Sequence, residues 1–190
     1  MEDYDCRVFA LEAAASLNNT RLRTWQAELA LQLSGADPEL CFPLLTAGEK
    51  LLLESAATAV NISTQARNSA GGSFTPLTEE AALSAVWKAS VVQIFPVLEQ
   101  FRMEFISRYK QALQAHLPVR NSNGDIIRDA RELELGTLYY IVNQDPGSFS
   151  AAAGRSISLF RRVRNELAHN DVVPYAEVEH ILGTKTEAFL

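Results

Sequence analysis

The amino-acid sequence predicts an all-α protein, and three observations point to this fold class. Ala, Leu, Glu, Gln and Arg, which are strong helix formers, dominate the composition. No run of alternating β-branched residues is long enough to build a sheet. Apolar residues instead recur at helical spacing between polar or glycine-containing stops. With 190 residues, of which 47% are hydrophobic, the chain can form one domain with a helical extension.

The first 70 residues are expected to form an N-terminal helical region. One helix is predicted over residues 3–17, and the sequence Asn18-Asn19-Thr20 ends it, with Thr20 placed to cap the next helix. That second helix should stop at Gly35, because glycine readily adopts the left-handed backbone that follows a helix. Its apolar stripe consists of Leu22, Trp25, Leu29 and Leu33.

Two predicted helix starts and one predicted loop complete the N-terminal region. Asp37, followed by a proline, is typical of a helix cap with proline in the first turn. Thr46 and Glu49 have the spacing of a capping box, in which each side chain satisfies a backbone N–H group near the other, and they predict a helix to about residue 65. Residues 68–76 are small, polar and rich in glycine, which predicts a loop or a seam between subdomains.

Residues 74–190 are expected to form a helical bundle. A long helix is predicted over residues 78–117, and Pro96 should kink or split it because proline removes one backbone hydrogen bond. The dipeptide Asn123-Gly124 favours a tight two-residue turn. Residues 119–128 therefore form either a small β-hairpin or an ordered loop.

Three further helices are predicted in this bundle. The first covers residues 129–143. Ser148 or Ser150 caps the second helix, which reaches residue 168. The third begins at Pro174 and ends at Gly183. The sequence leaves open whether the N-terminal region packs on this bundle or forms a separate domain.

Basic charge is concentrated on one predicted helix. The chain as a whole carries a formal charge of −6, which argues against a protein that coats polyanions. Residues 155–169 nevertheless hold four arginines and one glutamate, a net charge of +3, so the rest of the chain carries −9. Any contact with a polyanion should therefore be confined to this helix.

Helical spacing of about 100° per residue sorts this segment into two faces. The core-facing stripe consists of Leu159, Phe160, Val163 and Leu167. The opposite face consists of Arg155, Arg162, Glu166 and His169. Arg164 lies at the border, where a long side chain can bury its stem and project its guanidinium outward.

The stretch Arg164-Asn165-Glu166-Leu167-Ala168-His169 carries the only chemically suggestive spacing in the sequence. It resembles the signature of the HEPN superfamily, in which four to six residues separate an arginine from a histidine and a polar residue follows the arginine. The motif closes a long amphipathic helix and precedes a proline-containing segment and a final helix. The resemblance covers about residues 78–183 and does not extend to residues 1–70.

The resemblance implies a bundle of four or five helices that often dimerises, and a metal-independent endoribonuclease that needs no cofactor. Cleavage uses the RNA's own 2′-hydroxyl as the nucleophile. His169 would be the general acid or base, Arg164 would stabilise the charge on the phosphate, and Asn165 would orient the histidine or hold the phosphate. The resemblance also implies a role in defence or in a toxin–antitoxin pair, with an antitoxin or a nucleotidyltransferase as partner in some relatives.

The chemistry of these side chains fits such roles. Histidine titrates nearest to neutral pH, and the planar arginine fork matches phosphate oxygens. Three further arginines could track an RNA backbone in a salt-dependent way: Arg155, Arg161 and Arg162. Alternatively they form a solvated face, or pair with acids such as Glu132, Glu134 or Glu177, for about 0–1 kcal/mol each. One of Tyr139 and Tyr140 is expected to face the cleft in which, as the resemblance implies, the arginine and histidine of two subunits converge.

Two functions of other classes stay open. The chain could be a non-catalytic HEPN-like module that binds nucleotide or RNA, or that serves in dimerisation and partner docking. It could also be a helical interaction protein in which the arginine–histidine spacing is accidental. RNA cleavage in the presence of EDTA separates the first reading from both of these.

Several kinds of site are not expected. Cys6 and Cys41 are interpreted as reduced core thiols, because two lone cysteines make neither a disulfide framework nor a zinc site. His116 and His180 have no cysteine or carboxylate at ligand spacing, so no metal site is expected. The sequence suggests no signal peptide and no apolar stretch long enough to cross a membrane, which predicts a cytoplasmic protein.

Overall fold

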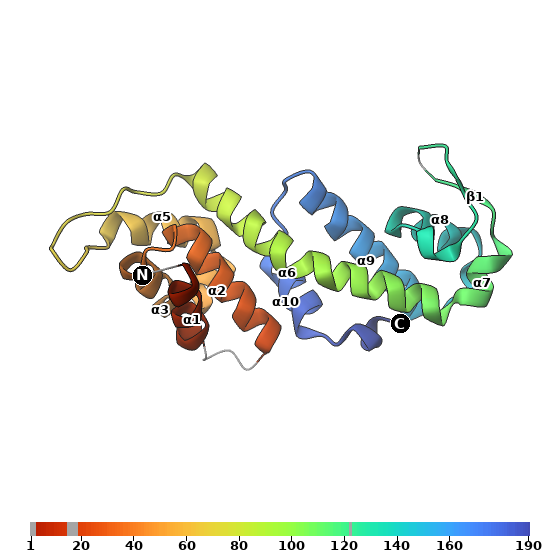
Figure 1. Ribbon diagram of the computed structural model, residues 1–190, viewed down its shortest axis with the longest axis horizontal. Helices are drawn as coiled ribbons and strands as arrows, with labels where there is room; N and C mark the ends of the chain where they lie inside the picture. The colour runs from red at the N-terminus through yellow and green to blue at the C-terminus, as the bar shows by residue number, and fades with distance from the viewer. Residues whose placement is uncertain (1–2, 15–18, 122) are drawn as a thin grey trace. The chain divides into compact units, whose positions relative to one another are not determined.

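The computed structural model describes residues 3–14, 19–121 and 123–190 (Figure 1). The all-α prediction is confirmed: these residues form ten α-helices, a few short 3₁₀ turns and one sheet of two short strands. The chain divides into two compact units. The first contains Met1–Ile94 and Asn170–Gly183, and the second contains Phe95–His169 and Thr184–Leu190. The predicted domain boundary at residues 70–74 lies in the first unit and stays a prediction.

The first unit is built around a buried tryptophan. Its helices are α1 (Asp3–Ala13), α2 (Thr20–Ser34), α3 (Pro38–Thr46), α4 (Glu49–Leu53), α5 (Ser55–Gln65), the first part of α6 (Glu79–Arg108) and α10 (Tyr175–Gly183). Trp25 of α2 is 1% exposed, and its indole N–H donates to the hydroxyl of Ser90 at 3.3 Å. Its ring also packs on Tyr175, with 5.8 Å between the centroids. One aromatic side chain thus joins α2, α6 and α10.

Helix α2 follows the prediction in its stripe and in its end. All four stripe residues are buried, and Gly35 ends the helix with φ at 60°. The cap, however, is Asn19 rather than Thr20: the Asn19 side chain accepts a hydrogen bond from the backbone N–H of Leu22 at 3.1 Å. Thr20 already lies inside the helix, so its hydroxyl is one residue too late to cap it. Residues 15–17 of the predicted first helix lie outside the described residues.

The predicted capping box at Thr46 is wrong. Thr46 is the last residue of α3, and its hydroxyl donates to the carbonyl of Pro43 at 3.0 Å. Gly48, with φ at 55°, precedes α4 and offers no side chain for capping. The helix expected up to residue 65 is also divided at Glu54, into α4 and α5. The Asp37 cap is confirmed, since its side chain accepts from the backbone N–H of Glu39 at 2.9 Å.

The second unit has an aromatic core. It contains the rest of α6, α7 (Lys110–Ala115), β1 (Val119–Arg120), β2 (Ile126–Ile127), α8 (Leu135–Gln144) and α9 (Ala151–Ala168). Phe160 of α9 is fully buried and stacks on Phe101 of α6, with 4.1 Å between the ring centroids. Phe189 meets Phe160 edge-on at 4.9 Å. These contacts fix which face of α9 is buried, and therefore which face carries the arginines.

Two helix predictions in this unit need correction. Helix α6 runs without interruption through Pro96, and the break lies at Tyr109, before α7. One lost backbone bond at Pro96 is offset by its buried helical neighbours, including Val97 and Leu98. The helix expected over residues 129–143 begins only at Leu135, because Ala130–Glu132 form a 3₁₀ turn, called the 3₁₀ turn below.

The hairpin and the cap of α9 are confirmed, with one change. Strands β1 and β2 pair antiparallel, with Val119 opposite Ile127. Strand β1 ends at Arg120 and β2 begins at Ile126, so the connection is longer than a two-residue turn; Gly124 adopts φ at 89° within it. Of the two serines proposed as caps of α9, Ser150 accepts from the backbone N–H of Ala153 at 3.0 Å.

Among the described helices, α6 alone is long and apolar enough to cross a membrane by length and composition. The expectation that the sequence holds no such stretch was therefore wrong. Of its most apolar 18-residue window, 44% is buried inside the protein, where Ile94 is fully covered. A core helix of a soluble protein has the same properties. The structure is thus compatible with a soluble protein, and the cytoplasmic location stays a prediction.

Replacing the core ring of α9 is expected to unfold the second unit more readily. Phe160→Ala removes a fully buried ring that packs on two others, so the free energy of unfolding should fall by about 3–5 kcal/mol. Chemical denaturation followed by circular dichroism measures this loss. Arg155→Ala, an exposed change on the same helix, should stay within about 0.5 kcal/mol of wild type. Equal effects of the two changes would contradict the packing described here.

Candidate functional site

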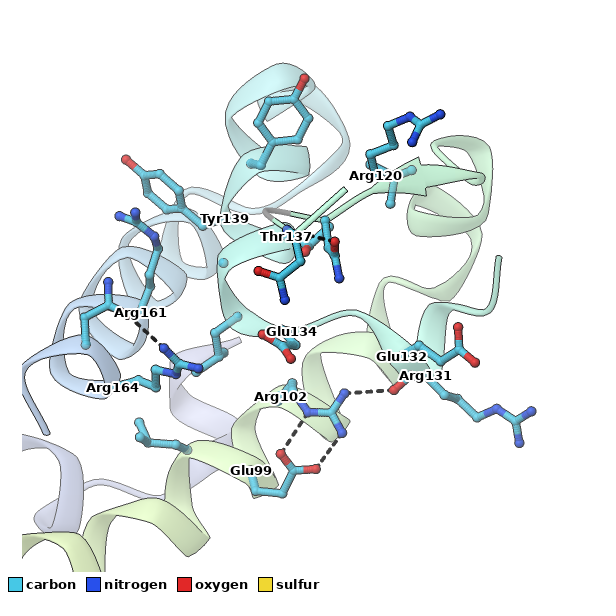
Figure 2. Close-up of a pocket in the computed structure, with 18 of the residues that line it drawn as sticks. Glu99, Arg102, Arg120, Arg131, Glu132, Glu134, Thr137, Tyr139, Arg161 and Arg164 are labelled. Carbon is cyan, nitrogen blue, oxygen red and sulfur yellow. Dashed lines mark hydrogen bonds and ion pairs between the residues drawn. The ribbon is translucent and has the colours of Figure 1, made fainter. Parts of the chain in front are cut away.

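Helix α9 forms one wall of an open groove in the second unit (Figure 2). The groove has a volume of about 1280 Å³. Residues from α6, the β1–β2 hairpin, the 3₁₀ turn, α8 and α9 line it. Its charged side chains are Arg102, Arg120, Arg131, Arg161, Arg164, Glu99, Glu132 and Glu134. Five arginines against three glutamates give the lining a net charge of +2, in a chain whose total charge is −6.

Arg102 links α6 to the segment before α8 at one side of the groove. Its Nε donates to Glu99 at 2.8 Å, and its Nη1 donates to the carbonyls of Arg131 at 2.9 Å and Leu133 at 3.0 Å. The hydrogen bonds with Glu99 raise the pKa of Arg102 and lower the pKa of Glu99. Because its guanidinium is already engaged on several sides, Arg102 serves to hold α6 against the 3₁₀ turn.

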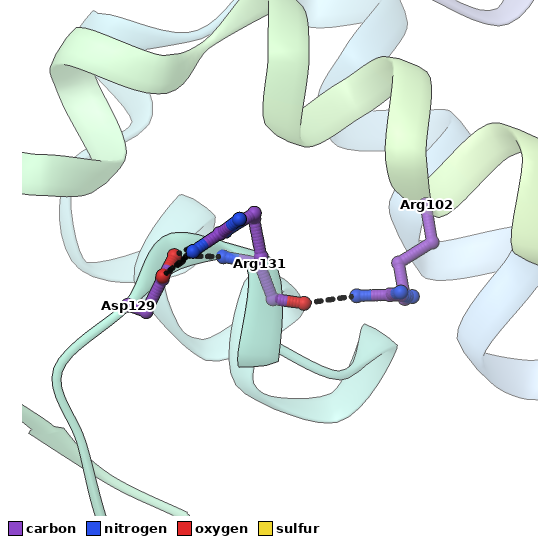
Figure 3. A network of polar contacts seen from close by, with 3 residues as sticks. All are labelled: Arg102, Asp129 and Arg131. Atoms are coloured by element: carbon purple, nitrogen blue, oxygen red, sulfur yellow. Dashed lines mark hydrogen bonds and ion pairs between the residues drawn. The ribbon is translucent and has the colours of Figure 1, made fainter.

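Arg131, in the 3₁₀ turn, also has its guanidinium bound to a partner (Figure 3). Its guanidinium forms an ion pair with Asp129 at 2.6 Å, and its backbone N–H donates to the same carboxylate at 2.9 Å. The Arg131 side-chain hydrogen bonds lower the pKa of Asp129 to about 2. Both side chains are exposed enough for solvent to screen this pair, so its role is to shape the turn rather than to add stability.

Two arginines of α9 point into the groove without a carboxylate partner in the described part of the chain. Arg161 lies over the ring of Tyr139, with its guanidinium carbon 4.6 Å from the ring centroid. Arg164 donates a hydrogen bond to the side-chain oxygen of Asn165 at 3.3 Å. Glu132 and Glu134 line the same groove, yet no ion pair joins either of them to an α9 arginine in these residue ranges. Positive charge on this wall is therefore accessible to an anionic ligand.

The structure separates the predicted site residues into two groups. Arg161, Arg164 and Asn165 line the groove together. Arg155 and Arg162 do not line it: both are exposed on other faces of α9, and Arg162 forms an ion pair with Glu166 at 3.2 Å. Of the three arginines expected to track RNA, Arg161 alone is thus placed in the groove.

His169 does not line the groove of the single chain. It is the C-terminal cap of α9, and its backbone N–H donates to the carbonyl of Asn165 at 3.0 Å. Asn170 follows with φ at 63°, the left-handed conformation that ends helices. The imidazole is exposed. In the part of the chain that the structure describes, the Asn165 side chain bonds to Arg164 and no hydrogen bond links it to the His169 ring.

The groove contains residues that the sequence did not single out. The hairpin contributes Arg120 and Asn121 to the wall that is not part of α9, and α6 contributes Phe95. Tyr139 and Tyr140 both line the groove, where one of them was expected. For Glu99 and Arg102, the spacing of three residues on one helix is a local signal that could have indicated their ion pair.

The described residues contain no group of three or more His, Cys, Asp or Glu side chains that could hold a metal ion. The two thiols, Cys6 and Cys41, are buried and free, as interpreted from the sequence. Burial raises the pKa of Cys41 to about 11, so this thiol is protonated at neutral pH. His116 lies 3.3 Å from Asp145, and Ser148 donates to the same carboxylate at 2.6 Å. The hydroxyl of Ser148, followed by the His116 ring, lowers the pKa of Asp145.

Comparisons with known proteins identify no relative. No protein-family model matches the chain, and neither a curated protein nor a solved structure matches it.

Proposed function

From the groove and the motif that borders it, we propose that this protein is a metal-independent endoribonuclease of the HEPN type. The observation that carries the proposal is the position of Arg164 and Asn165, which line a groove that also presents Arg161 and two tyrosines. An exposed histidine, His169, closes the same helix. Cleavage of RNA needs a group that binds phosphate and a group that transfers a proton, and α9 carries both an arginine and a histidine. The tyrosines of the neighbouring α8 offer rings on which bases can stack.

In the proposed reaction, the 2′-hydroxyl of RNA attacks the adjacent phosphorus. His169 takes the proton from that hydroxyl or gives one to the leaving 5′-oxygen, and water makes the other of these two proton transfers. The new O–P bond forms as the bond to the 5′-oxygen breaks, which leaves a 2′,3′-cyclic phosphate and a 5′-hydroxyl. Arg164 binds the phosphate oxygens through its planar fork and stabilises the negative charge that builds up on them. Asn165, which accepts from Arg164, keeps that guanidinium aligned.

The proposal includes a homodimer with a HEPN-like bundle. In the ribonucleases that the motif resembles, the arginine and histidine of two subunits converge in one cleft. A second copy of α9 would supply the histidine that the groove of one chain lacks, and it would double the basic charge across a two-fold axis. We place the protein in the cytoplasm, in defence or toxin–antitoxin biology, with an antitoxin or a nucleotidyltransferase as its partner.

One observation favours a second candidate function. Because His169 lies outside the groove, the groove could bind RNA or a nucleotide without cutting it. The protein would then be a HEPN-like module for binding, dimerisation or partner docking. In that case the arginine and tyrosine side chains keep their roles, and His169 only caps its helix.

RNA cleavage without metal separates these candidates. The purified protein is incubated with a broad panel of RNAs in buffer that contains EDTA. We expect cut products with 2′,3′-cyclic phosphate ends, detected by mass spectrometry, because the reaction needs only the ribose hydroxyl and protein side chains. RNA that stays intact across the whole panel, while still binding to the protein, would favour the second candidate.

A further inference from the structure

We infer that the groove holds an unpaired nucleobase of single-stranded RNA on the layer that Arg161 forms with Tyr139. The inference rests on the proposed function and names its class of substrate. It also assigns a binding subsite that is distinct from the motif residues Arg164 and His169.

The subsite begins with two stacked side chains from neighbouring helices. The guanidinium carbon of Arg161 on α9 lies 4.6 Å from the ring centroid of Tyr139 on α8 (Figure 2). A planar guanidinium that rests on an aromatic ring has a second, uncovered face. Arg161 is exposed, and its partner ring is half-buried, so this face is open to a ligand. Arginine planes and aromatic rings are the surfaces on which proteins stack unpaired bases.

Other aromatic side chains of the groove are unusually exposed. Tyr140 is 52% exposed, and its hydroxyl accepts a hydrogen bond from the side-chain amide of Gln144 at 2.6 Å, which restrains the ring. Phe95 on α6 is 38% exposed and lines the same groove. Large apolar side chains gathered in a polar groove mark a ligand-binding site more often than a packing defect. Successive bases of one strand could stack at more than one of these positions.

The polar lining matches a base better than a track of phosphates. Glutamates stand among the arginines, so the net charge of +2 is small for a surface that binds only a phosphate backbone. Base edges carry both hydrogen-bond donors and acceptors, which carboxylates and amides can satisfy. Asn143 lines the groove and donates from its amide nitrogen to the carbonyl of Tyr139 at 2.8 Å, which leaves its side-chain oxygen as an acceptor.

A double-stranded RNA does not fit this subsite. In an A-form helix the bases are stacked on one another, and the major groove that holds their edges is too deep and narrow for side chains. Only an unpaired base offers a free face to the Arg161–Tyr139 layer. The same groove should therefore discriminate single strands from a duplex of the same sequence.

Binding to an RNA that cannot be cut tests the inference separately from cleavage. The probe is a fluorescein-labelled single-stranded oligonucleotide with 2′-O-methyl groups throughout, which removes the nucleophile but keeps the bases. Fluorescence anisotropy with the wild-type protein gives the reference Kd. Tyr139→Ala should raise the Kd by about 5- to 100-fold, as expected for the loss of one stacking platform. Tyr139→Phe, which keeps the ring, should stay within about threefold of wild type.

Matched variants control for folding and for charge. Tyr140→Ala alters an exposed side chain, so it tests the aromatic lining even if Tyr139→Ala unfolds the protein. Arg161→Ala should weaken binding clearly more than Arg155→Ala, which removes the same charge from the same helix outside the groove. A duplex version of the probe should bind more weakly than the single strand.

The outcomes distinguish this inference from the proposed function. Tight binding by the wild type that Tyr139→Ala weakens, without any cleavage of ordinary RNA, supports the subsite and contradicts the endoribonuclease. Cleavage of ordinary RNA together with unchanged binding by folded Tyr139→Ala and Tyr140→Ala overturns the subsite alone. Equal affinity for duplex and single strand, or no binding of the probe at all, also overturns the subsite.

Discussion

His169→Ala is expected to lower the rate of RNA cleavage by about 100- to 10,000-fold. A positioned general acid or base contributes a factor of this size, because it moves a proton as the O–P bond forms or breaks. Alanine removes the imidazole and keeps the backbone that ends α9. The His169 side chain is exposed, so its loss should leave the fold intact. The rate is measured under single-turnover conditions, with the enzyme in excess over the RNA, and circular dichroism checks the fold.

His180→Ala provides the control for this prediction. His180 is also an exposed histidine near a helix end, on α10, and has no part in the proposed site. Its replacement should leave the cleavage rate within about twofold of wild type. If His169→Ala and His180→Ala cut RNA equally fast, His169 is not the proton-transferring group, and the proposed mechanism fails.

Arg164→Ala is expected to lower the cleavage rate by about 100- to 1,000-fold, which is the usual effect of removing one donor to a developing negative charge. The guanidinium binds phosphate oxygens in pairs, whereas lysine keeps the charge but not the planar fork. Arg164→Lys should therefore recover only part of the lost rate. Full recovery with lysine would mean that charge alone acts at this position.

Two measurements sharpen the Arg164 prediction. Arg155→Ala, which removes the same charge from an exposed position of α9 outside the groove, should change the rate by less than about fivefold at moderate salt. Affinity for the uncut 2′-O-methyl probe should fall less than the rate does, because Arg164 is assigned to the transition state. If Arg164→Ala weakens binding of the probe but leaves the single-turnover cleavage rate of bound RNA unchanged, Arg164 acts in binding only.

The sequence predicted those parts of the fold that depend on short-range periodicity. The stripe of α2, with Trp25 and its neighbours, is buried as expected, and so are Phe160, Val163 and Leu167 of α9. An amphipathic helix carries its burial pattern in its own residues, so the exposed face of α9 and its arginines could also be predicted.

The sequence predictions were wrong where two local structures have similar free energies. Thr46 has capping-box spacing to Glu49, yet its hydroxyl bonds backward to Pro43 because α3 extends to that residue. Pro96 is a strong helix breaker, but tertiary packing on both sides keeps α6 continuous. At Thr46 a competing local bond within α3 displaces the predicted cap, whereas at Pro96 packing outweighs a local preference.

The groove itself could not be predicted because it joins elements that are distant in the sequence. Arg161 reaches the ring of Tyr139 only because α8 lies beside α9. Arg102 is held by carbonyls about thirty residues away, in the turn before α8. No periodicity within one helix encodes such contacts. The motif lies on α9 alone, whereas the groove also needs the side chains of α6, α8 and the hairpin.

The nature of the nucleophile is the most direct test of the proposed function. The measurement uses an RNA that the wild-type protein cuts at one bond, and the same oligonucleotide with a single 2′-deoxynucleotide on the 5′ side of that bond, both in EDTA. We expect that the all-ribose RNA yields a 2′,3′-cyclic phosphate and a 5′-hydroxyl, and that the deoxy-substituted bond stays intact. Cleavage of the deoxy-substituted bond at a similar rate, products with 5′-phosphate ends, or no cleavage of any RNA would contradict it.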